Sequence, residues 1–220
     1  MRSPQIGEIV DVFDLDHTLL NTESLWFNPA LDRLAECVPL SRAVVDARFA
    51  ECNQTTFTFA GLLERLGIEP SRRNDLEREL RDDLSARIEA CLYPGVIEML
   101  KARNHVARLA LVTAGDADWQ QWKFARLRAL HPFFRENDRH FVPLRGSKAD
   151  CFARYATASR ISFIDDSPRW HHEVAAAVRN VRHVRAMWPD TLGVSDHPGD
   201  GRDWDVACSA KEMLTILSVA

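Results

Sequence analysis

The chain has 220 residues, of which 46% are hydrophobic and 27% are charged, and its formal net charge is −4. This length suits one or two domains with a sizeable core, and the mild negative charge argues against a nucleic-acid or membrane-surface partner. Five dispersed cysteines form no C-x-x-C pair, the first residues lack the apolar core of a signal peptide, and no apolar run approaches the roughly 20 residues of a membrane helix. We therefore expect a cytoplasmic protein with free thiols.

The first predicted element is a strand that ends at two aspartates. An apolar run over residues 9–13 carries one charge and is followed by Asp14 and Asp16. Such runs are typical of strands that are buried on both faces of a parallel sheet. Ligands of these sheets bind at the carboxyl ends of the strands, where two carboxylates are costly unless a cation lies between them. A hard cation such as Mg²⁺ meets this need.

Residues 21–91 contain no convincing strand and are predicted to be helical. Apolar stripes at helical spacing run over residues 26–34, 44–49, 59–66 and 76–88. Gly67 is expected to end the third of these helices, and Ser71 is expected to cap the fourth. We interpret the segment as a helical insertion that lies over the active site.

From residue 92 onward, predicted strands and helices alternate, which is the pattern of a parallel α/β sheet. The strands are expected at residues 108–113, 140–143, 161–164 and 181–184. The helices are expected from residue 96, from 116 to about 130, from Ser147 with Asp150 as its capping-box partner, from Pro168 to about 178, and over 206–217. Residues 191–203 are rich in Gly, Pro and Asp and are expected to form a loop.

Polar residues follow four of the predicted strands, and their order is specific. They are Asp14 and Asp16, then Thr113, then Lys148, then Asp165 and Asp166. This order resembles that of the haloacid dehalogenase superfamily of hydrolases, in its phosphatase branch with a helical cap of the C1 type. The first signature of that superfamily, Asp-x-Asp-x-Thr, matches Asp14-Leu15-Asp16-His17-Thr18.

The resemblance implies a division of the chain into two parts. Residues 1–20 and 92–220 would form a discontinuous catalytic core, a Rossmann-like parallel sheet in three layers. Residues 21–91 resemble the all-helical cap of the family in position and length only.

The resemblance also implies a reaction, the Mg²⁺-dependent hydrolysis of a small phosphorylated metabolite. Asp14 would be the nucleophile that forms an aspartyl-phosphate, and Asp16 would act as general acid and then as general base. The metal would be held by the side chains of Asp14 and Asp166 and by the backbone carbonyl of Asp16. Asp165 would act through water or by orienting other groups.

Phosphate binding is expected from Thr113, from the backbone N–H groups of Ala114 and Gly115, and from Lys148. Lys148 lies in the first turn of a predicted helix, where the macrodipole disfavours a cation unless an anion binds there. Lys123 is the competing candidate, because its spacing from residues 115–120 also resembles a pattern of some family members. We favour Lys148 as the partner of Asp14.

Other conspicuous residues have simpler interpretations. His17 stands where the family commonly has Gly or Asn, and we interpret it as a turn residue, since His tolerates unusual backbone angles. His171, His172 and Glu173 lack the spacing of helical metal ligands and are expected to form a solvated helix face. The Trp residues are expected to pack the core or the lid, although Trp26 and Asn28 could line the substrate pocket.

Three alternatives keep the fold and change the function. Dehalogenation of a 2-haloacid is disfavoured by Asp16, since a halide leaves without a proton and family dehalogenases lack the second aspartate. A sugar-phosphate mutase would need a residue in the cap that outcompetes water, and none is identifiable. A catalytically silent binding module would not need all four motifs. The sequence names neither the substrate nor the oligomeric state.

Overall fold

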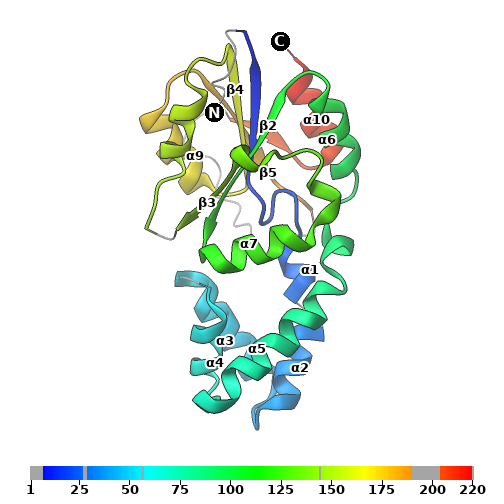
Figure 1. The fold of residues 1–220 in the computed structure, drawn as a ribbon, viewed down its shortest axis with the longest axis vertical. Helices are drawn as coiled ribbons and strands as arrows, with labels where there is room; N and C mark the ends of the chain where they lie inside the picture. Colours follow the sequence, from blue (N-terminus) through cyan, green and yellow to red (C-terminus); the bar gives the residue numbers. More distant parts are fainter. Residues whose placement is uncertain (1–6, 27–28, 56, 144, 190–203, 220) are drawn as a thin grey trace.

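The chain folds into a six-stranded parallel sheet with helices on both faces, and further helices lie beyond one end of the sheet (Figure 1). The structure is a computed structural model, and it describes residues 7–26, 29–55, 57–143, 145–189 and 204–219. The three-layer, Rossmann-like α/β class predicted from the sequence is confirmed. The whole of the expected loop at 191–203, and Asn28, lie outside the described residues.

The sheet has the doubly wound strand order β3-β2-β1-β4-β5-β6, which reverses direction between β1 and β4. Its strands are β1 (Ile9–Phe13), β2 (Arg108–Gly115), β3 (Arg139–Pro143), β4 (Arg160–Asp165), β5 (Val181–Ala186) and β6 (Asp205–Ala207). Phe13 is in register with Leu111 of β2 and with Ile164 of β4. The carboxyl ends of these central strands therefore meet at one edge, at the reversal point where ligands bind in such sheets.

Two hydrophobic cores cover the two faces of the sheet. The helices of this part of the chain are α6 (Val96–Asn104), α7 (Ala117–Arg126), α8 (Ala149–Phe152), α9 (Pro168–Ala177) and α10 (Ala210–Ser218), with short 3-10 turns η2 (Arg128–Leu130), η3 (Glu136–Asp138) and η4 (Ala153–Tyr155). Val10 and Val12 point into the core formed with α8 and α9, whereas Phe13 points into the core formed with α6, α7 and α10. Figure 1 shows α9 and the α6–α10 pair on opposite sides of the sheet.

The single charge in β1 is buried in an ion pair. Asp11 is 0% exposed, and its Oδ2 accepts a 2.7 Å hydrogen bond from Nε of Arg103 on α6, which is also buried. The apolar pattern of the strand predicted its burial but gave no sign of this partner, which lies 92 residues along the chain. The pair ties α6 to the sheet.

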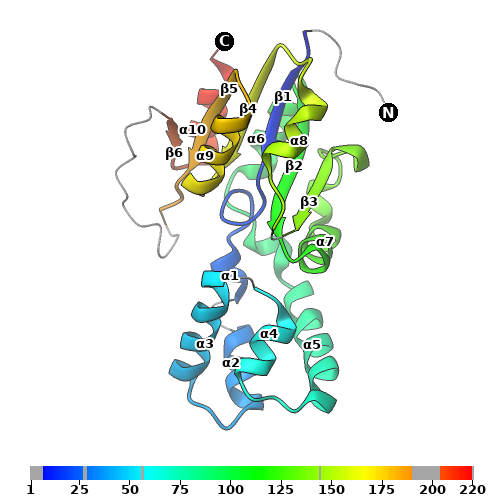
Figure 2. The same cartoon turned by 90° about the vertical axis from the view of Figure 1, so that its left-hand side faces the viewer.

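The helical segment, residues 22–91, lies beyond the carboxyl ends of the strands (Figure 1, Figure 2). It comprises α1 (Thr22–Trp26), α2 (Pro29–Cys37), α3 (Arg42–Thr55), α4 (Phe59–Arg65), α5 (Pro70–Ser85) and the 3-10 turn η1 (Ile88–Cys91). Leu76, Leu80 and Leu84 form the buried stripe of α5. Gly67 has φ of 73°, which confirms that it ends α4 in the left-handed conformation that glycine favours.

Several predicted details of the helical segment are wrong. The stripe at 26–34 is divided between two helices, because Pro29 begins α2. Val44 is 39% exposed, so the buried face of α3 contains Val45 but not Val44. Ser71 does not cap α5, because Pro70 already occupies the first turn, where its missing N–H costs nothing.

Three predicted details of the sheet region are also wrong. The helix expected to reach residue 130 ends at Arg126 and is followed by the 3-10 turn η2. Ser147 forms no capping box, because its hydroxyl donates to Glu173 Oε1 at 2.6 Å and Lys148 is the N-cap of α8. Val206 lies in the short edge strand β6, and α10 begins only after Ser209, whose side chain accepts from the backbone N–H of Glu212.

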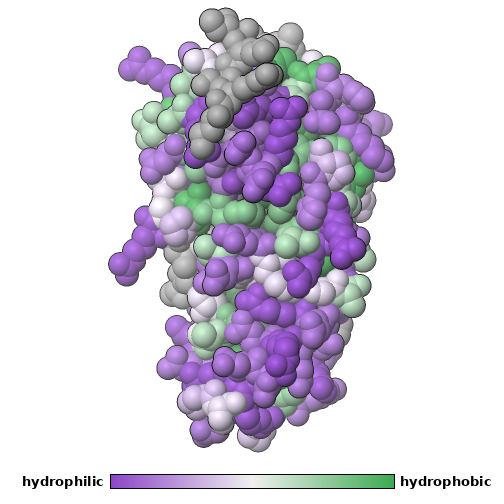
Figure 3. Space-filling view, in the orientation of Figure 1, coloured by the Kyte–Doolittle hydropathy of each residue, from purple (hydrophilic) through white to green (hydrophobic). Residues whose placement is uncertain are grey.

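The surface of the helical segment is mainly hydrophilic in the view of Figure 3. Every helix in the described part of the chain falls short of the length and apolar character that a bilayer crossing requires.

Candidate active site

Three carboxylates meet at the reversal point of the sheet. Asp14 directly follows β1, and its backbone N–H donates to the carbonyl of Ile164 at 2.9 Å, which aligns it with the end of β4. Asp165 and Asp166 are the next residues at that end, and one carboxylate oxygen from each of the three aspartates lies within 4.8 Å of the others. Asp14 and Asp165 are buried and Asp166 is half-buried. The strand register therefore brings together side chains that are about 150 positions apart in the sequence.

One lysine faces these three carboxylates. Lys148 is 1% exposed, and its Nζ donates to Asp14 Oδ1 at 2.7 Å and to Asp165 Oδ2 at 2.6 Å. Burial opposes its charge, but the two carboxylates outweigh burial and raise the pKa of Lys148. Lys148 therefore stays protonated and neutralises one of the negative charges.

The cluster retains an excess of negative charge. Burial is the largest effect on Asp14, and with the charges of Asp165 and Asp16 it raises the pKa of Asp14 to about 7, although Lys148 opposes the shift. Burial, followed by the charges of Asp165 and Asp14, raises the pKa of Asp166 well above its ordinary value. Hard divalent cations take carboxylate oxygens as ligands. The donor set and its charge therefore fit a cation such as Mg²⁺.

Asp16 faces the same cavity but has its own partners. Its carboxylate forms an ion pair with Lys123 and accepts hydrogen bonds from Gln120 Nε2 at 2.8 Å and from Thr22 Oγ1 at 2.5 Å. Burial favours the neutral acid, but the charge of Lys123 and these hydrogen bonds hold the pKa of Asp16 well below its ordinary value. Asp16 is therefore ionised in this arrangement.

Lys123 and Lys148 were the two candidates for the active-site lysine. In the structure both line one cavity, and each forms an ion pair with a different aspartate. Lys148 pairs with Asp14, as expected from the resemblance, while Lys123 pairs with Asp16. Gln120 and Lys123 are three positions apart on α7, so they share a helix face. The spacing of Gln120 and Lys123 predicted that the two side chains lie together. That they both contact Asp16 follows only from the position of α7 against the loop after β1.

The carboxyl end of β2 supplies another side of the cavity. Ala114 and Gly115 line it, whereas Thr113 and Asp165 lie behind it and are fully buried. Among the described residues, the hydroxyl of Thr113 has no hydrogen-bond partner, which is unusual for a buried polar atom. Gly115 has φ of 155°, which other residues rarely adopt, and a Cβ at this position would lie 2.7 Å from Gln120 Nε2, so a larger residue would displace the side chain that donates to Asp16.

His17 has the conformation expected of it. Its φ is 56°, in the left-handed region, within the tight loop in which its N–H donates to the carbonyl of Leu20 at 2.8 Å. This confirms its interpretation as a turn residue.

The interpretation of His171 as part of a solvated face is wrong. It is 0% exposed, and its Nε2 lies 3.0 Å from the carbonyl oxygen of Asp165, while its Nδ1 lies 3.0 Å from Nδ1 of His183. Burial lowers the pKa of His171 to about 4, so the ring is neutral. Because a carbonyl can only accept, Nε2 carries the proton, and His171 helps to hold the backbone of the acidic pair.

The cavity has a volume of about 400 Å³ and is lined by both parts of the fold. Its lining residues are Asp14, Asp16, His17, Thr22, Trp26, Phe57, Ala114, Gly115, Asp116, Trp119, Gln120, Lys123, Lys148, Asp166, Arg169 and Trp170. Trp26 therefore lies where the sequence suggested. Phe57, Trp119 and Trp170 were missed, because nothing in their local pattern separates a lining ring from a core ring. Arg169 was missed because its local pattern is that of any exposed helix residue.

The family model described as haloacid dehalogenase-like hydrolase matches residues 12–201 of the chain. The chain belongs to this family. A comparison with curated proteins gave no match.

Solved structures with the same fold include other members of the haloacid dehalogenase-like hydrolases. One from Burkholderia xenovorans is 18% identical with a TM-score of 0.71, and the alignment covers 96% of each chain. A candidate β-phosphoglucomutase from Thermotoga maritima is 20% identical with a TM-score of 0.63, covering 96% of this chain and 98% of that one. The hydrolase YfnB of Bacillus subtilis, described as bound to magnesium, is 16% identical with a TM-score of 0.59, covering 97% and 100%. At these identities the similarity concerns the fold.

Proposed function

We propose that this hydrolase is a Mg²⁺-dependent phosphomonoesterase that acts on a small phosphorylated metabolite through an aspartyl-phosphate. The observation that carries the proposal is that Asp14 and Asp16 line one cavity, each with its own lysine. A nucleophile and a separate acid–base group are what hydrolysis of a phosphate ester requires.

The residues present fit the metal. Asp14 and Asp166 would hold it with the backbone carbonyl of Asp16. Both oxygens of Asp165 are already engaged, one by Lys148 at 2.6 Å and the other by the backbone N–H of Ser167 at 2.9 Å, which supports an orienting role for Asp165. When bound, Mg²⁺ would offset the charge between the carboxylates and the phosphate. The magnesium in the YfnB structure supports this assignment.

In the first step, an oxygen of Asp14 attacks phosphorus, the bond from phosphorus to the ester oxygen breaks, and the leaving oxygen takes a proton from Asp16. Because Asp16 is ionised beside Lys123, it first takes up that proton from water or from a substrate that binds as its monoanion. In the second step, water attacks the phosphorus of the aspartyl-phosphate, Asp16 accepts the proton of the water, and inorganic phosphate leaves from a restored Asp14. Lys123 holds Asp16 in the ionised form that the second step needs.

The phosphoryl group needs donors around it during both steps. Lys148, the hydroxyl of Thr113 and the backbone N–H groups of Ala114 and Gly115 are proposed to supply them. We further propose that residues 21–91 act as a cap, because Thr22, Trp26 and Phe57 of this segment line the cavity and restrict the entry of water and bulky substrates.

Asp16 also separates this function from haloacid dehalogenation. A halide leaves without a proton, so a half-buried carboxylate with three hydrogen-bonding partners would have no task in that reaction. A mutase would return the phosphoryl group to a sugar instead of to water, and product analysis distinguishes the two.

Removal of the metal is expected to stop phosphate release. With Mg²⁺, a panel of phosphorylated metabolites should include at least one ester from which inorganic phosphate is released. EDTA should lower that rate by at least about 100-fold, because the attacking carboxylate and the phosphate would then repel each other. Adding Mg²⁺ back should restore it. An equal rate in EDTA would contradict the metal assignment, and a bisphosphorylated product without phosphate release would favour the mutase.

Replacing Asp16 by Asn should trap the covalent intermediate. With p-nitrophenyl phosphate, whose leaving group needs no proton, the variant should release about one equivalent of p-nitrophenolate in a burst. Turnover should then fall by about 10²- to 10⁴-fold, since the base for the second step is missing. Rapid-mixing absorbance and phosphoprotein mass spectrometry measure both quantities. Asp118→Asn, at an exposed position in the first turn of α7, is the matched control. Wild-type turnover in the Asp16 variant would exclude the assigned role.

A further inference from the structure

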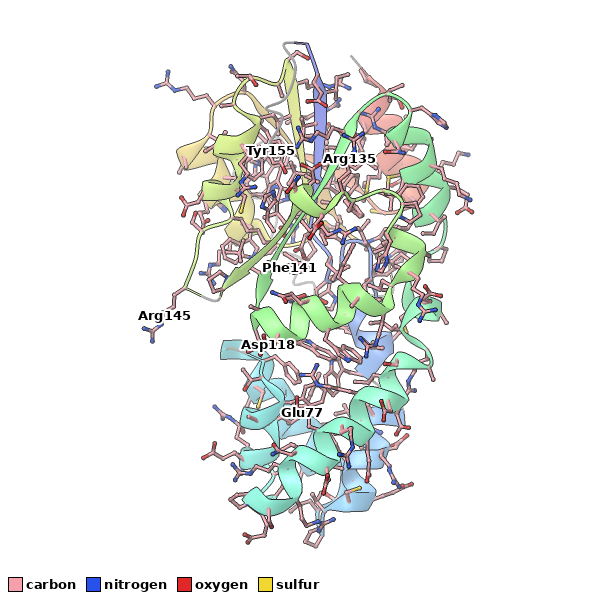
Figure 4. All side chains as sticks on the ribbon, in the orientation of Figure 1. Glu77, Asp118, Arg135, Phe141, Arg145 and Tyr155 are labelled. Atoms are coloured by element: carbon pink, nitrogen blue, oxygen red, sulfur yellow. The ribbon has the colours of Figure 1, made fainter. Side chains whose placement is uncertain are left out.

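An aromatic wall, formed by Trp26, Phe57 and Trp119, lines part of the cavity. The ring centroid of Trp119 on α7 lies 5.7 Å from that of Trp26 on α1 and 5.9 Å from that of Phe57, and the latter two lie 4.8 Å apart. All three residues line the cavity. Figure 4 shows side chains filling the space between α7, which carries the labelled Asp118, and α5, which carries the labelled Glu77.

The Trp119 ring is held in place by further contacts. Trp122 stacks on it with a centroid distance of 4.8 Å and an interplanar angle of 12°. Arg81 of α5 places its guanidinium carbon 5.4 Å from the centroid of the same ring and pairs with Glu77 at 2.7 Å. Trp119 is 4% exposed and Trp26 is 2% exposed, so they present only a small part of their rings to the cavity, and the half-buried Phe57 presents more. Because these rings are already fixed, a ligand that contacts them does not have to order them first.

Among its described residues, the helical segment contributes no charged side chain to the lining of the cavity. Its lining residues are Thr22, Trp26 and Phe57, and the hydroxyl of Thr22 already donates to Asp16. Among the described lining side chains, the buried polar atoms without a partner are Gln120 Oε1 and His17 Nδ1. Both atoms are buried. On the side of the aromatic rings the lining therefore offers few polar partners, and the hydroxyl groups of a polyhydroxylated sugar placed there would face aromatic carbon.

A second element adds another ring to the cavity. Trp170 of α9 is half-buried and lines the cavity, and Lys148 Nζ lies 5.2 Å from its ring centroid. The exposed Arg169 lies over the same ring, with its guanidinium carbon 4.6 Å from the centroid. Aromatic surface thus comes from the helical segment, from α7 and from α9, around a cavity of about 400 Å³ that suits one phosphate and one ring.

We infer that the leaving group of the substrate carries an aromatic ring, attached to the ester oxygen directly or through one methylene. Aromatic rings prefer offset or edge-to-face contacts with other rings over contacts with saturated groups of equal size. This inference rests on the proposed function and specifies its substrate class.

Three esters with primary alkoxide leaving groups test the substrate class, because the chemistry of bond cleavage is then matched. They are benzyl phosphate, cyclohexylmethyl phosphate and glucose 6-phosphate. The value of kcat/KM for benzyl phosphate should exceed that for cyclohexylmethyl phosphate by about tenfold, and that for glucose 6-phosphate by more. The corresponding benzyl- and cyclohexylmethylphosphonates, which cannot be hydrolysed, should show the same preference in calorimetric binding with Mg²⁺ present.

Phe57→Leu should lower the ratio of benzyl to cyclohexylmethyl phosphate toward one, because leucine keeps an apolar surface and removes the ring. Phe59→Leu is the matched control, since Phe59 belongs to the same aromatic cluster, with its ring 5.6 Å from that of Phe57, but does not line the cavity. The control should keep the wild-type ratio.

The outcomes separate the two proposals. Equal binding of the two phosphonates, a preference for glucose 6-phosphate, or an unchanged ratio in Phe57→Leu would overturn the substrate class and leave the phosphatase intact. If phosphate release from every ester equals that of the Asp14→Asn variant, while the benzylphosphonate is still preferred, the proposed reaction fails and the aromatic site stands.

Discussion

The Asp14→Asn variant is expected to lose turnover by about four to six orders of magnitude, as enzymes do when their nucleophile is removed. The amide keeps the size of the side chain and can still accept a hydrogen bond from Lys148, so the cavity should keep its shape. What it loses is the anionic oxygen that attacks phosphorus. Phosphate release with Mg²⁺ and mass spectrometry for a phosphorylated protein measure the effect, and no phosphoenzyme should form.

The same variant should not be destabilised in the absence of metal. Burial, together with the charges of Asp165 and Asp16, raises the pKa of Asp14 to about 7, and the amide removes this unfavourable charge. The Tm in EDTA should therefore equal or exceed that of the wild type, and Mg²⁺ should raise it less. The exposed Asp118→Asn variant should behave as wild type in every assay. Turnover near the wild-type rate in Asp14→Asn would exclude Asp14 as the nucleophile.

The Lys148→Met variant is expected to lose both activity and stability. In the wild type, the ammonium group of Lys148 donates to Asp14 at 2.7 Å and to Asp165 at 2.6 Å. Methionine cannot donate, so both buried carboxylates lose this partner. Breaking a buried ion pair from one side costs about 3–5 kcal/mol of the free energy of unfolding. Denaturant unfolding in EDTA measures this cost.

Magnesium should recover part of the stability of Lys148→Met, because a bound cation can replace the missing charge. The stabilisation by Mg²⁺ should then be larger in the variant than in the wild type. Lys101→Met, on the exposed surface of α6, is the matched control and should change the free energy of unfolding by no more than about 0.5 kcal/mol. Wild-type stability of Lys148→Met in EDTA would show that the carboxylates do not depend on this lysine.

Much of the core fold followed from local patterns. The apolar run before Asp14 and the run before Asp165 predicted strands because only a two-sided burial suits consecutive apolar, β-branched residues. Once parallel strands are assigned, their carboxyl ends must share an edge, so the proximity of Asp14 to Asp165 was predictable without coordinates. Elements with weak local signals were missed. The edge strand β6 has three residues and pairs only with β5, so the sequence around Val206 resembles the start of a helix equally well.

The sequence by itself determined the fold class and the order of the polar residues at the strand ends, because strand periodicity and residue type are local properties. The tertiary structure decided that Lys123 pairs with Asp16 and Lys148 with Asp14. Both lysines come after a strand, and their partners depend on the direction from which α7 and α8 approach the cavity. The burial of His171 and the aromatic wall around Trp119 were decided in the same way. The burial and the contacts of a side chain depend on the element that packs against it, and in these cases that element is far away in the sequence.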